Sequence, residues 1–141
     1  MGGLRIRLFG EVELSFAGDR LPELGSVRAE SLLAYLVVHR RAAVPRQRLA
    51  DLLWPESSEQ QERTNLRQLL HRLRQALPDA DRFLEVTSRA LRWRGAADCW
   101  VDVVAFEESL ADGDQSAAVE AYGGDLLEGS YDERVLVPWS A

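Results

Sequence analysis

The residues with the clearest chemical meaning lie between Arg63 and Leu77, a stretch with four Arg and no Asp or Glu. A guanidinium pairs bidentately with guanine or phosphate, and a glutamine amide pairs with adenine in the same way. A surface helix normally mixes both charge signs and so gains i,i+4 ion pairs, which this stretch gives up. The composition indicates nucleic acid as the ligand, and the alternative is a basic, solvated helix that packs on a sheet.

The spacing of apolar residues predicts the helix that positions these side chains. On a wheel of about 100° per residue, one side collects apolar residues and the opposite side collects hydrogen-bonding groups. The apolar side comprises Leu66, Leu69, Leu70, Leu73, Ala76 and Leu77. The opposite side comprises Thr64, Gln68, His71 and Gln75, flanked by Gln61, Arg67 and Arg72. Helix 60–77 is therefore predicted to enter a DNA major groove, whose width of about 12 Å admits one helix.

Two sets of candidate contacts follow from this placement. The side chains predicted to contact bases are Thr64, Arg67, Gln68, His71 and Arg72. The side chains predicted to contact phosphate are Arg46, Arg48, Arg63, Arg74 and Gln75. Arg46 and Arg48 belong to the second set because they stand near the start of a preceding helix, whose positive N-terminus attracts anions.

Two shorter helices are predicted before the basic one. Ser26 is a suitable N-cap for the first, which is expected to end near Arg40. Pro45 suits the first turn of the second, since the missing N–H of proline is unpaired there in any case. Trp54-Pro55 ends that helix, because a proline moves the residue before it out of the helical region. Trp54 itself is interpreted as an anchor of the core.

Alternating apolar and polar residues predict strands at the start of the chain. Residues 4–8 and 12–16 alternate as half-buried strands do, so they predict a small antiparallel sheet. A turn at residues 17–20 is expected to lead into a short edge at Leu21 and Pro22.

A hairpin is predicted at residues 83–94, with its two strands joined by Ser88, Arg89 and Ala90. Three helices followed by a hairpin form a winged helix-turn-helix, in which the second helix crosses the DNA backbone and the third enters the groove. The candidate contacts of this wing are Ser88, Arg89 and Arg92, and Arg89 is placed to reach a narrow minor groove, which attracts arginine. Arg92 has a second interpretation, as part of the solvated face of the hairpin.

Charge is distributed unevenly along the 141 residues, whose net charge is −6. Residues 28–94 hold thirteen Arg against eight acidic residues, whereas residues 95–141 hold one Arg against eleven. A basic middle joined to an acidic tail is typical of a nucleic-acid-binding module fused to another segment. No apolar run approaches the roughly 20 residues of a membrane span, so we expect a cytoplasmic protein with no membrane partner.

Enzymatic and metal chemistry are not indicated. The sequence has no Walker loop, no Gly-rich dinucleotide turn and no nucleophile elbow. His71 has no acidic residue near it in the sequence to orient it as a catalytic base. Cys99 is the only cysteine, and it stands apart from both histidines, so neither a disulfide nor a zinc site is expected. We predict no catalytic residues, no metal and no cofactor.

Residues 49–55 (LADLLWP) and 65–77 (NLRQLLHRLRQAL) closely resemble one family. It is the Streptomyces antibiotic regulatory protein (SARP) family, with its relatives that have a bacterial transcriptional activator domain and an OmpR-type winged helix. Residues 9–13 (FGEVE) and 122–129 (YGGDLLEG) are similar to further parts of the same family. The resemblance covers nearly the whole chain.

The resemblance implies a domain organisation and a set of partners. Residues 1–97 would form the OmpR-type winged-helix domain, and residues 98–141 the start of a truncated activator domain of tetratricopeptide-like helices. The fold class is then α+β, with a short all-α segment at the end. The implied partners are double-stranded DNA with direct repeats near promoters, a second copy bound head-to-tail, and RNA polymerase, contacted through loop 55–61. The alternative is a winged-helix module that binds proteins and not DNA.

Overall fold

The structure is a computed structural model that describes residues 3–95 and 98–113. These residues form two compact units, one of residues 3–23 with 98–113 and one of residues 24–95, and each is described by itself. Residues 114–141 of the predicted activator segment lie outside the described residues. Within the described ranges, no helix has both the length and the apolar character needed to cross a membrane.

The smaller unit is built on a four-stranded sheet with the order β3-β2-β1-β7. Its strands are β1 (Leu4–Arg7), β2 (Glu13–Phe16), β3 (Asp19–Arg20) and β7 (Trp100–Val101). β1 and β2 are antiparallel, as predicted. The predicted edge at Leu21 and Pro22 is wrong by two residues, because Ala17 and Gly18 alone make the turn, both with positive φ. The sheet is also not wholly antiparallel, since β7 pairs in parallel with β1.

Helix α5 (Asp102–Ala111) is attached to this sheet through a buried carboxylate. The Asp102 carboxylate accepts hydrogen bonds from the backbone N–H groups of Leu8, Phe9 and Val103, at 2.9, 3.0 and 2.8 Å. Burial raises the pKa of Asp102 above its ordinary value, although these three N–H groups oppose the shift. Asp102 therefore joins the start of α5 to the end of β1.

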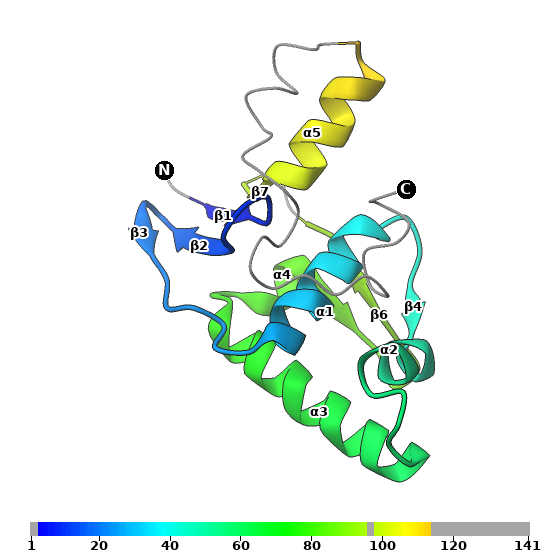
Figure 1. The fold of residues 1–141 in the computed structure, drawn as a ribbon. Coiled ribbons are helices and arrows are strands. Elements are labelled where there is room, and N and C mark those ends of the chain that lie inside the picture. The colour runs from blue at the N-terminus through cyan, green and yellow to red at the C-terminus, as the bar shows by residue number, and fades with distance from the viewer. Residues whose placement is uncertain (1–2, 96–97, 114–141) are drawn as a thin grey trace. The chain divides into compact units, whose positions relative to one another are not determined.

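The larger unit contains the three predicted helices and the predicted hairpin (Figure 1). Its elements are α1 (Val27–Val38), β4 (Val44–Pro45), α2 (Arg46–Leu53), α3 (Glu59–Ala76), α4 (Ala80–Phe83), β5 (Leu84–Val86) and β6 (Ala90–Trp93). Ser26 caps α1 as predicted, and its side chain accepts a hydrogen bond from the backbone N–H of Ala29. Ser58 caps α3 in the same way.

The core of this unit lies between α1, α3 and the hairpin. α1 contacts both α3 and β6, and all of its residues from Ser31 to Val37 are buried. α3 contributes the leucines of its predicted apolar side, of which Leu66, Leu69, Leu70 and Leu73 are buried. Phe83 stacks on Trp93 of β6, with ring centroids 6.2 Å apart. The predicted inward side of the basic helix is confirmed.

Two expectations about the second helix are corrected. Pro45 precedes α2 instead of occupying its first turn, and it pairs with Ala90 in β4. β4 is an edge strand of the order β4-β6-β5, where a residue without an N–H is tolerated. Trp54, interpreted as a core anchor, is only half-buried. Its ring lies beneath the guanidinium of Arg28, 5.6 Å from the ring centroid.

Candidate nucleic-acid interface

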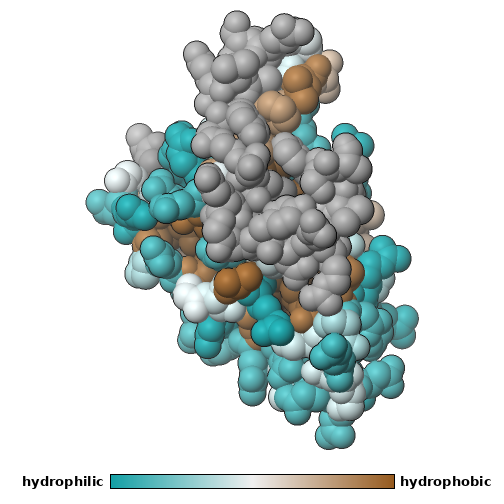
Figure 2. Space-filling model, viewed as in Figure 1, coloured by the Kyte–Doolittle hydropathy of each residue, from teal (hydrophilic) through white to brown (hydrophobic). Residues whose placement is uncertain are grey.

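The outward side of α3 displays most of the side chains predicted to contact bases. Arg67, Gln68, His71 and Arg72 are exposed. Thr64 is half-buried, and its hydroxyl donates to the Gln60 carbonyl at 3.1 Å. Figure 2 shows hydrophilic residues over the part of the view where Figure 1 places α3. The outward side of α3 is therefore polar, and its inward side consists mainly of leucines.

The polar residues on the outward side of α3 fall into a central stripe and two flanks. Thr64, Gln68 and Gln75 lie at helical spacing opposite the buried leucines, so they form the centre. Arg63, Arg67 and Arg74 share one flank, because they are separated by four and seven residues. Amide groups suited to bases thus have arginines beside them that suit phosphate.

One groove joins α3 to the start of α2 and the tip of the hairpin. We call it the wing groove, and its volume is about 510 Å³. Its lining includes Arg46, Arg63, Thr64, Arg67, Ser88 and Arg89, together with Pro45, Gln47, Gln60 and Leu66. The structure therefore brings together residues from all three predicted sets, and none of the described residues that line this groove is acidic.

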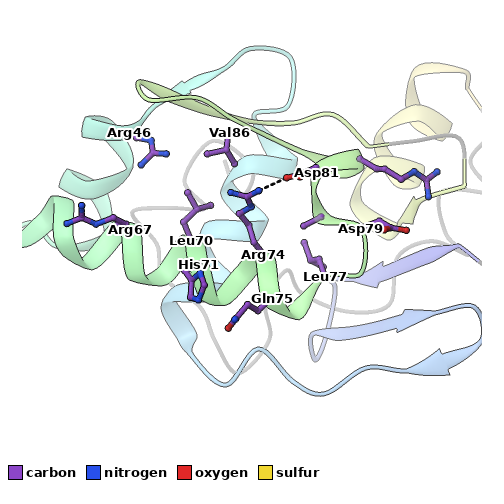
Figure 3. Close-up of a pocket in the computed structure, with 12 residues that line it drawn as sticks. Arg46, Arg67, Leu70, His71, Arg74, Gln75, Leu77, Asp79, Asp81 and Val86 are labelled. Carbon is purple, nitrogen blue, oxygen red and sulfur yellow. Dashed lines mark hydrogen bonds and ion pairs between the residues drawn. The ribbon is translucent and has the colours of Figure 1, made fainter.

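A second groove of about 690 Å³ runs along the C-terminal half of α3 toward α4, and we call it the α4 groove. Its polar lining includes Arg46, Arg67, His71, Arg74, Gln75, Asp79, Asp81 and Arg82. Figure 3 shows Arg74 pointing from α3 to Asp81, with which it forms an ion pair 2.6 Å long. Unlike the wing groove, this groove has an acidic end.

A third, smaller groove of about 240 Å³ lies on the other flank of α3, and it contains residues that the sequence did not single out for binding. It is lined by Ser26, Arg28, Trp54, Asn65, Gln68, Leu69 and Arg72. Arg28 is held in place because its Nε donates to the Leu53 carbonyl at 3.1 Å. Trp54 is the sequence signal for this groove, because the tryptophan predicted to anchor the core is half-buried and lines the groove instead.

Arg46 connects α2 with the wing. Its Nε donates to the Thr87 carbonyl at 2.9 Å, and its backbone N–H donates to the Arg89 carbonyl at 2.8 Å. Thr87 in turn accepts from the backbone N–H of Ala90 at 3.0 Å, which closes the hairpin loop. Arg46, a predicted phosphate contact, thus has its Nε–H engaged within the protein, and it holds the tip of the hairpin beside α3.

The other predicted contacts are exposed but less well grouped. Arg48 and Arg92 are exposed and line none of these three grooves. Arg92 Nε donates to the Arg40 carbonyl at 3.2 Å, just beyond the end of α1. This contact accords with its second interpretation, on the face of the hairpin.

The charges around α3 leave most of its arginines without acidic neighbours. Within residues 3–95 and 98–113, Arg63, Arg67, Arg72 and Arg89 form no ion pair. Glu62, the acid nearest to this stretch, is buried against α2, and its carboxylate accepts from Gln47 Nε2 at 3.1 Å. Burial, and then the neighbouring Asp51 carboxylate, raise the pKa of Glu62.

The described residues contain no group of three or more His, Cys, Asp or Glu side chains that could hold a metal ion. The polar groups gathered at α3 are arginines, amides and one histidine, which recognise phosphates and base edges. The arrangement is suited to binding and offers no catalytic constellation within the described part of the chain.

Comparison with known proteins supports this interpretation. No curated protein sequence matches the chain. A solved structure, Mycobacterium tuberculosis EmbR in complex with a low affinity phosphopeptide, is similar in fold, with a TM-score of 0.75 and 22% sequence identity. The match covers 98% of this chain and 41% of that one, so the present chain spans less than half of that protein. Residues 25–90 match the family model described as transcriptional regulatory protein, C terminal.

Proposed function

We propose that this protein is a sequence-specific DNA-binding transcription regulator that places α3 in the major groove and the hairpin of β5 and β6 beside it. The observation that supports this most directly is the wing groove. Arg46, Arg63, Arg67 and Arg89 line it from α2, α3 and the hairpin loop, and no acid from residues 3–95 or 98–113 lies among its lining. Such a groove suits the phosphate ridge between a major groove and the adjacent minor groove.

Sequence would be read by the outward side of α3. We propose that Arg67, Gln68, His71 and Arg72, with Thr64, contact base edges, since Arg suits guanine and Gln suits adenine. Arg46, Arg48, Arg63 and Gln75 are proposed to contact phosphates, as is Arg74 once its ion pair with Asp81 opens, and Ser88, Arg89 and Arg92 are proposed to act from the wing. These contacts would position the helix before it reads bases.

The mode of regulation is proposed from the family resemblance. We propose that two copies bind head-to-tail on direct repeats, that the protein activates transcription, and that the loop before α3 meets RNA polymerase. That loop is shorter than the predicted 55–61, because α3 begins at Glu59. Each chain has one α3 to insert, so a pair of repeats spaced by about one helical turn, 10–10.5 bp, suits two copies. Action on a bacterial chromosome would place the protein in the cytoplasm.

Selection of bound duplexes from a random pool tests this function. We expect an enriched short motif, repeated in one orientation if the pairing mode is right. Binding should weaken with salt at a log–log slope near −5, from roughly 0.9 for each of about six neutralised phosphates. A motif that occurs singly would contradict the paired mode alone. If no sequence is enriched and no salt-dependent binding occurs, the protein is not a DNA-binding regulator, and a protein-binding winged helix becomes the better description.

A further inference from the structure

One arginine of the α3 flank that faces the hairpin is already neutralised within the protein. Arg74 Nη2 lies 2.6 Å from Asp81 Oδ1 in the α4 groove. Arg63 and Arg67 lie on the same flank and pair with no acid among residues 3–95 and 98–113. In Figure 3, Gln75 points away from Asp81 while Arg74 points to it. The ion pair therefore separates Arg74 from otherwise similar neighbours.

Asp81 is held in position independently of Arg74. Its main-chain carbonyl accepts a hydrogen bond from Arg94 Nη2 at 2.5 Å, which ties α4 to the residue after β6. Asp79, just before α4, has a left-handed backbone with φ of 52° and so turns the chain after α3. The hairpin and this turn thus place the Asp81 carboxylate at the acidic end of a groove whose other polar residues are mostly basic.

Stability does not account well for this ion pair. The side chains of Arg74 and Asp81 are 43% and 81% exposed, and pairs this exposed contribute little to folding. A carboxylate in this position would also be repelled by DNA phosphates if α3 lay in the major groove. The Asp81 carboxylate lines the same groove as Arg46, Arg67 and His71, so it should weaken DNA binding. A role in setting DNA affinity would explain its position there.

We propose that Asp81 limits the affinity of the protein for DNA by competing with phosphate for the Arg74 guanidinium, an inference that rests on the proposed function. The Arg74 guanidinium donates to Asp81 Oδ1 through Nη2 at 2.6 Å, and a phosphate oxygen would be bound by the same donor. A phosphate therefore competes with Asp81 for Nη2, and the ion pair must open for this group to reach DNA. Asp81 is thus a determinant of affinity that touches neither base nor phosphate.

The test measures binding of the full chain to a fluorescent duplex of mixed sequence, between about 50 and 200 mM salt. Asp81→Asn should steepen the log–log salt slope by about 0.9 and raise affinity roughly threefold to tenfold, because one more phosphate is neutralised. Asp79→Asn is the matched control. It removes the same charge from the same groove, it breaks no ion pair with Arg74, and asparagine tolerates the left-handed backbone. Its slope should equal that of the wild type.

Two further variants separate the ion pair from a general effect of charge. In an Arg74→Gln background, Asp81→Asn should no longer steepen the slope. Arg74→Gln alone should change the wild-type slope far less than Arg63→Gln, which should flatten it by about 0.9. If circular dichroism shows that Asp81→Asn does not fold, the comparison of Arg74→Gln with Arg63→Gln tests the proposal by itself.

The inference is overturned if Asp81→Asn behaves like Asp79→Asn, if its effect persists without Arg74, or if Arg74→Gln flattens the slope as much as Arg63→Gln. These outcomes leave the proposed function intact as long as the wild type binds duplex DNA. A wild type that binds no duplex at any salt concentration overturns the proposed function, and this inference with it.

Discussion

Arg67→Ala is the substitution that tests most directly how α3 is used. Arg67 lines both the wing groove and the α4 groove, and it is exposed. No ion pair within the described residues holds it, and alanine is the best helix former, so the fold should survive the change. Any loss of binding can then be assigned to a missing contact with DNA.

The size of the loss depends on what Arg67 contacts. If its guanidinium pairs with a guanine, affinity for the selected motif should fall by about 1–3 kcal/mol, or roughly 5- to 140-fold. Affinity for a duplex without the motif should stay nearly the same, because a base contact contributes only at its own base. The salt slope should also be unchanged, since no phosphate contact is lost.

Fluorescence anisotropy with motif and mixed-sequence duplexes, at several salt concentrations, distinguishes these cases. Arg41→Ala is the control, because Arg41 is exposed and lines none of the three grooves. An equal loss on both duplexes, with a slope flatter by about 0.9, would make Arg67 a phosphate contact. Unchanged binding to both duplexes would show that this side of α3 does not face DNA, and the proposed orientation would be wrong.

Three other predictions concern the stability of the two units. Leu70→Ala should destabilise the protein by about 2–5 kcal/mol in urea unfolding, because the side chain is 5% exposed, and an unchanged midpoint would contradict the wheel assignment. Asp102→Ala leaves the N–H groups of Leu8, Phe9 and Val103 without their acceptor, so it should lower the free energy of unfolding by about 3 kcal/mol or more. Hydrogen exchange in β1 should become faster, and native-like protection there would refute the role of the carboxylate. Because the pKa of Glu62 is raised from 4.5, the folded state holds this proton more tightly than the unfolded state, and stability falls as pH rises above 4.5 toward the raised pKa. Thermal melts should therefore show that the wild type loses more stability than Glu62→Gln between about pH 4.5 and 7, and parallel losses would rule the effect out.

Periodic elements of the fold could be predicted closely from the sequence. Helix 60–77 was expected, and α3 spans Glu59–Ala76, because 18 residues repeat the leucine pattern over several turns. The hairpin at residues 83–94 is likewise predicted from two short strand-like runs joined by a three-residue loop. In the structure, β5 ends at Val86 and β6 begins at Ala90, so the loop is shifted by one residue. In both cases the signal lies within the segment itself.

Three short elements, β4, β7 and α4, could not be predicted, because they depend on contacts or turns outside their own residues. β4 exists because Val44 pairs with Leu91, and β7 because Val101 pairs with Ile6. α4 has four residues and follows the left-handed Asp79, so it has no periodic signal of its own. A sequence window too short for one period cannot distinguish such elements from loops.

The candidate site divides in the same way. Exposure of Arg67, Gln68 and His71 followed from the wheel, because opposite sides of one helix are fixed by their spacing. The partners of the arginines did not follow. Arg46 donates to a carbonyl 41 residues away, and Arg74 pairs with an acid seven residues away across the end of α3. Sequence thus predicted which side chains face outward, and only the structure showed which of them are already engaged.

Net charge has little bearing on whether this protein binds DNA, and the same reasoning raises the importance of Asp81. At physiological ionic strength a charge acts over about 8 Å, so a phosphate near α3 responds to its immediate neighbours and not to the total of −6. In the grooves along the wing-facing flank of α3, the titratable side chains that the structure describes are arginines, one histidine and two aspartates. Asp79 and Asp81 are thus the acids placed to oppose binding there, and only Asp81 also neutralises an arginine of α3. One carboxylate in this position should therefore influence DNA affinity more than the many acids that give the chain its negative charge.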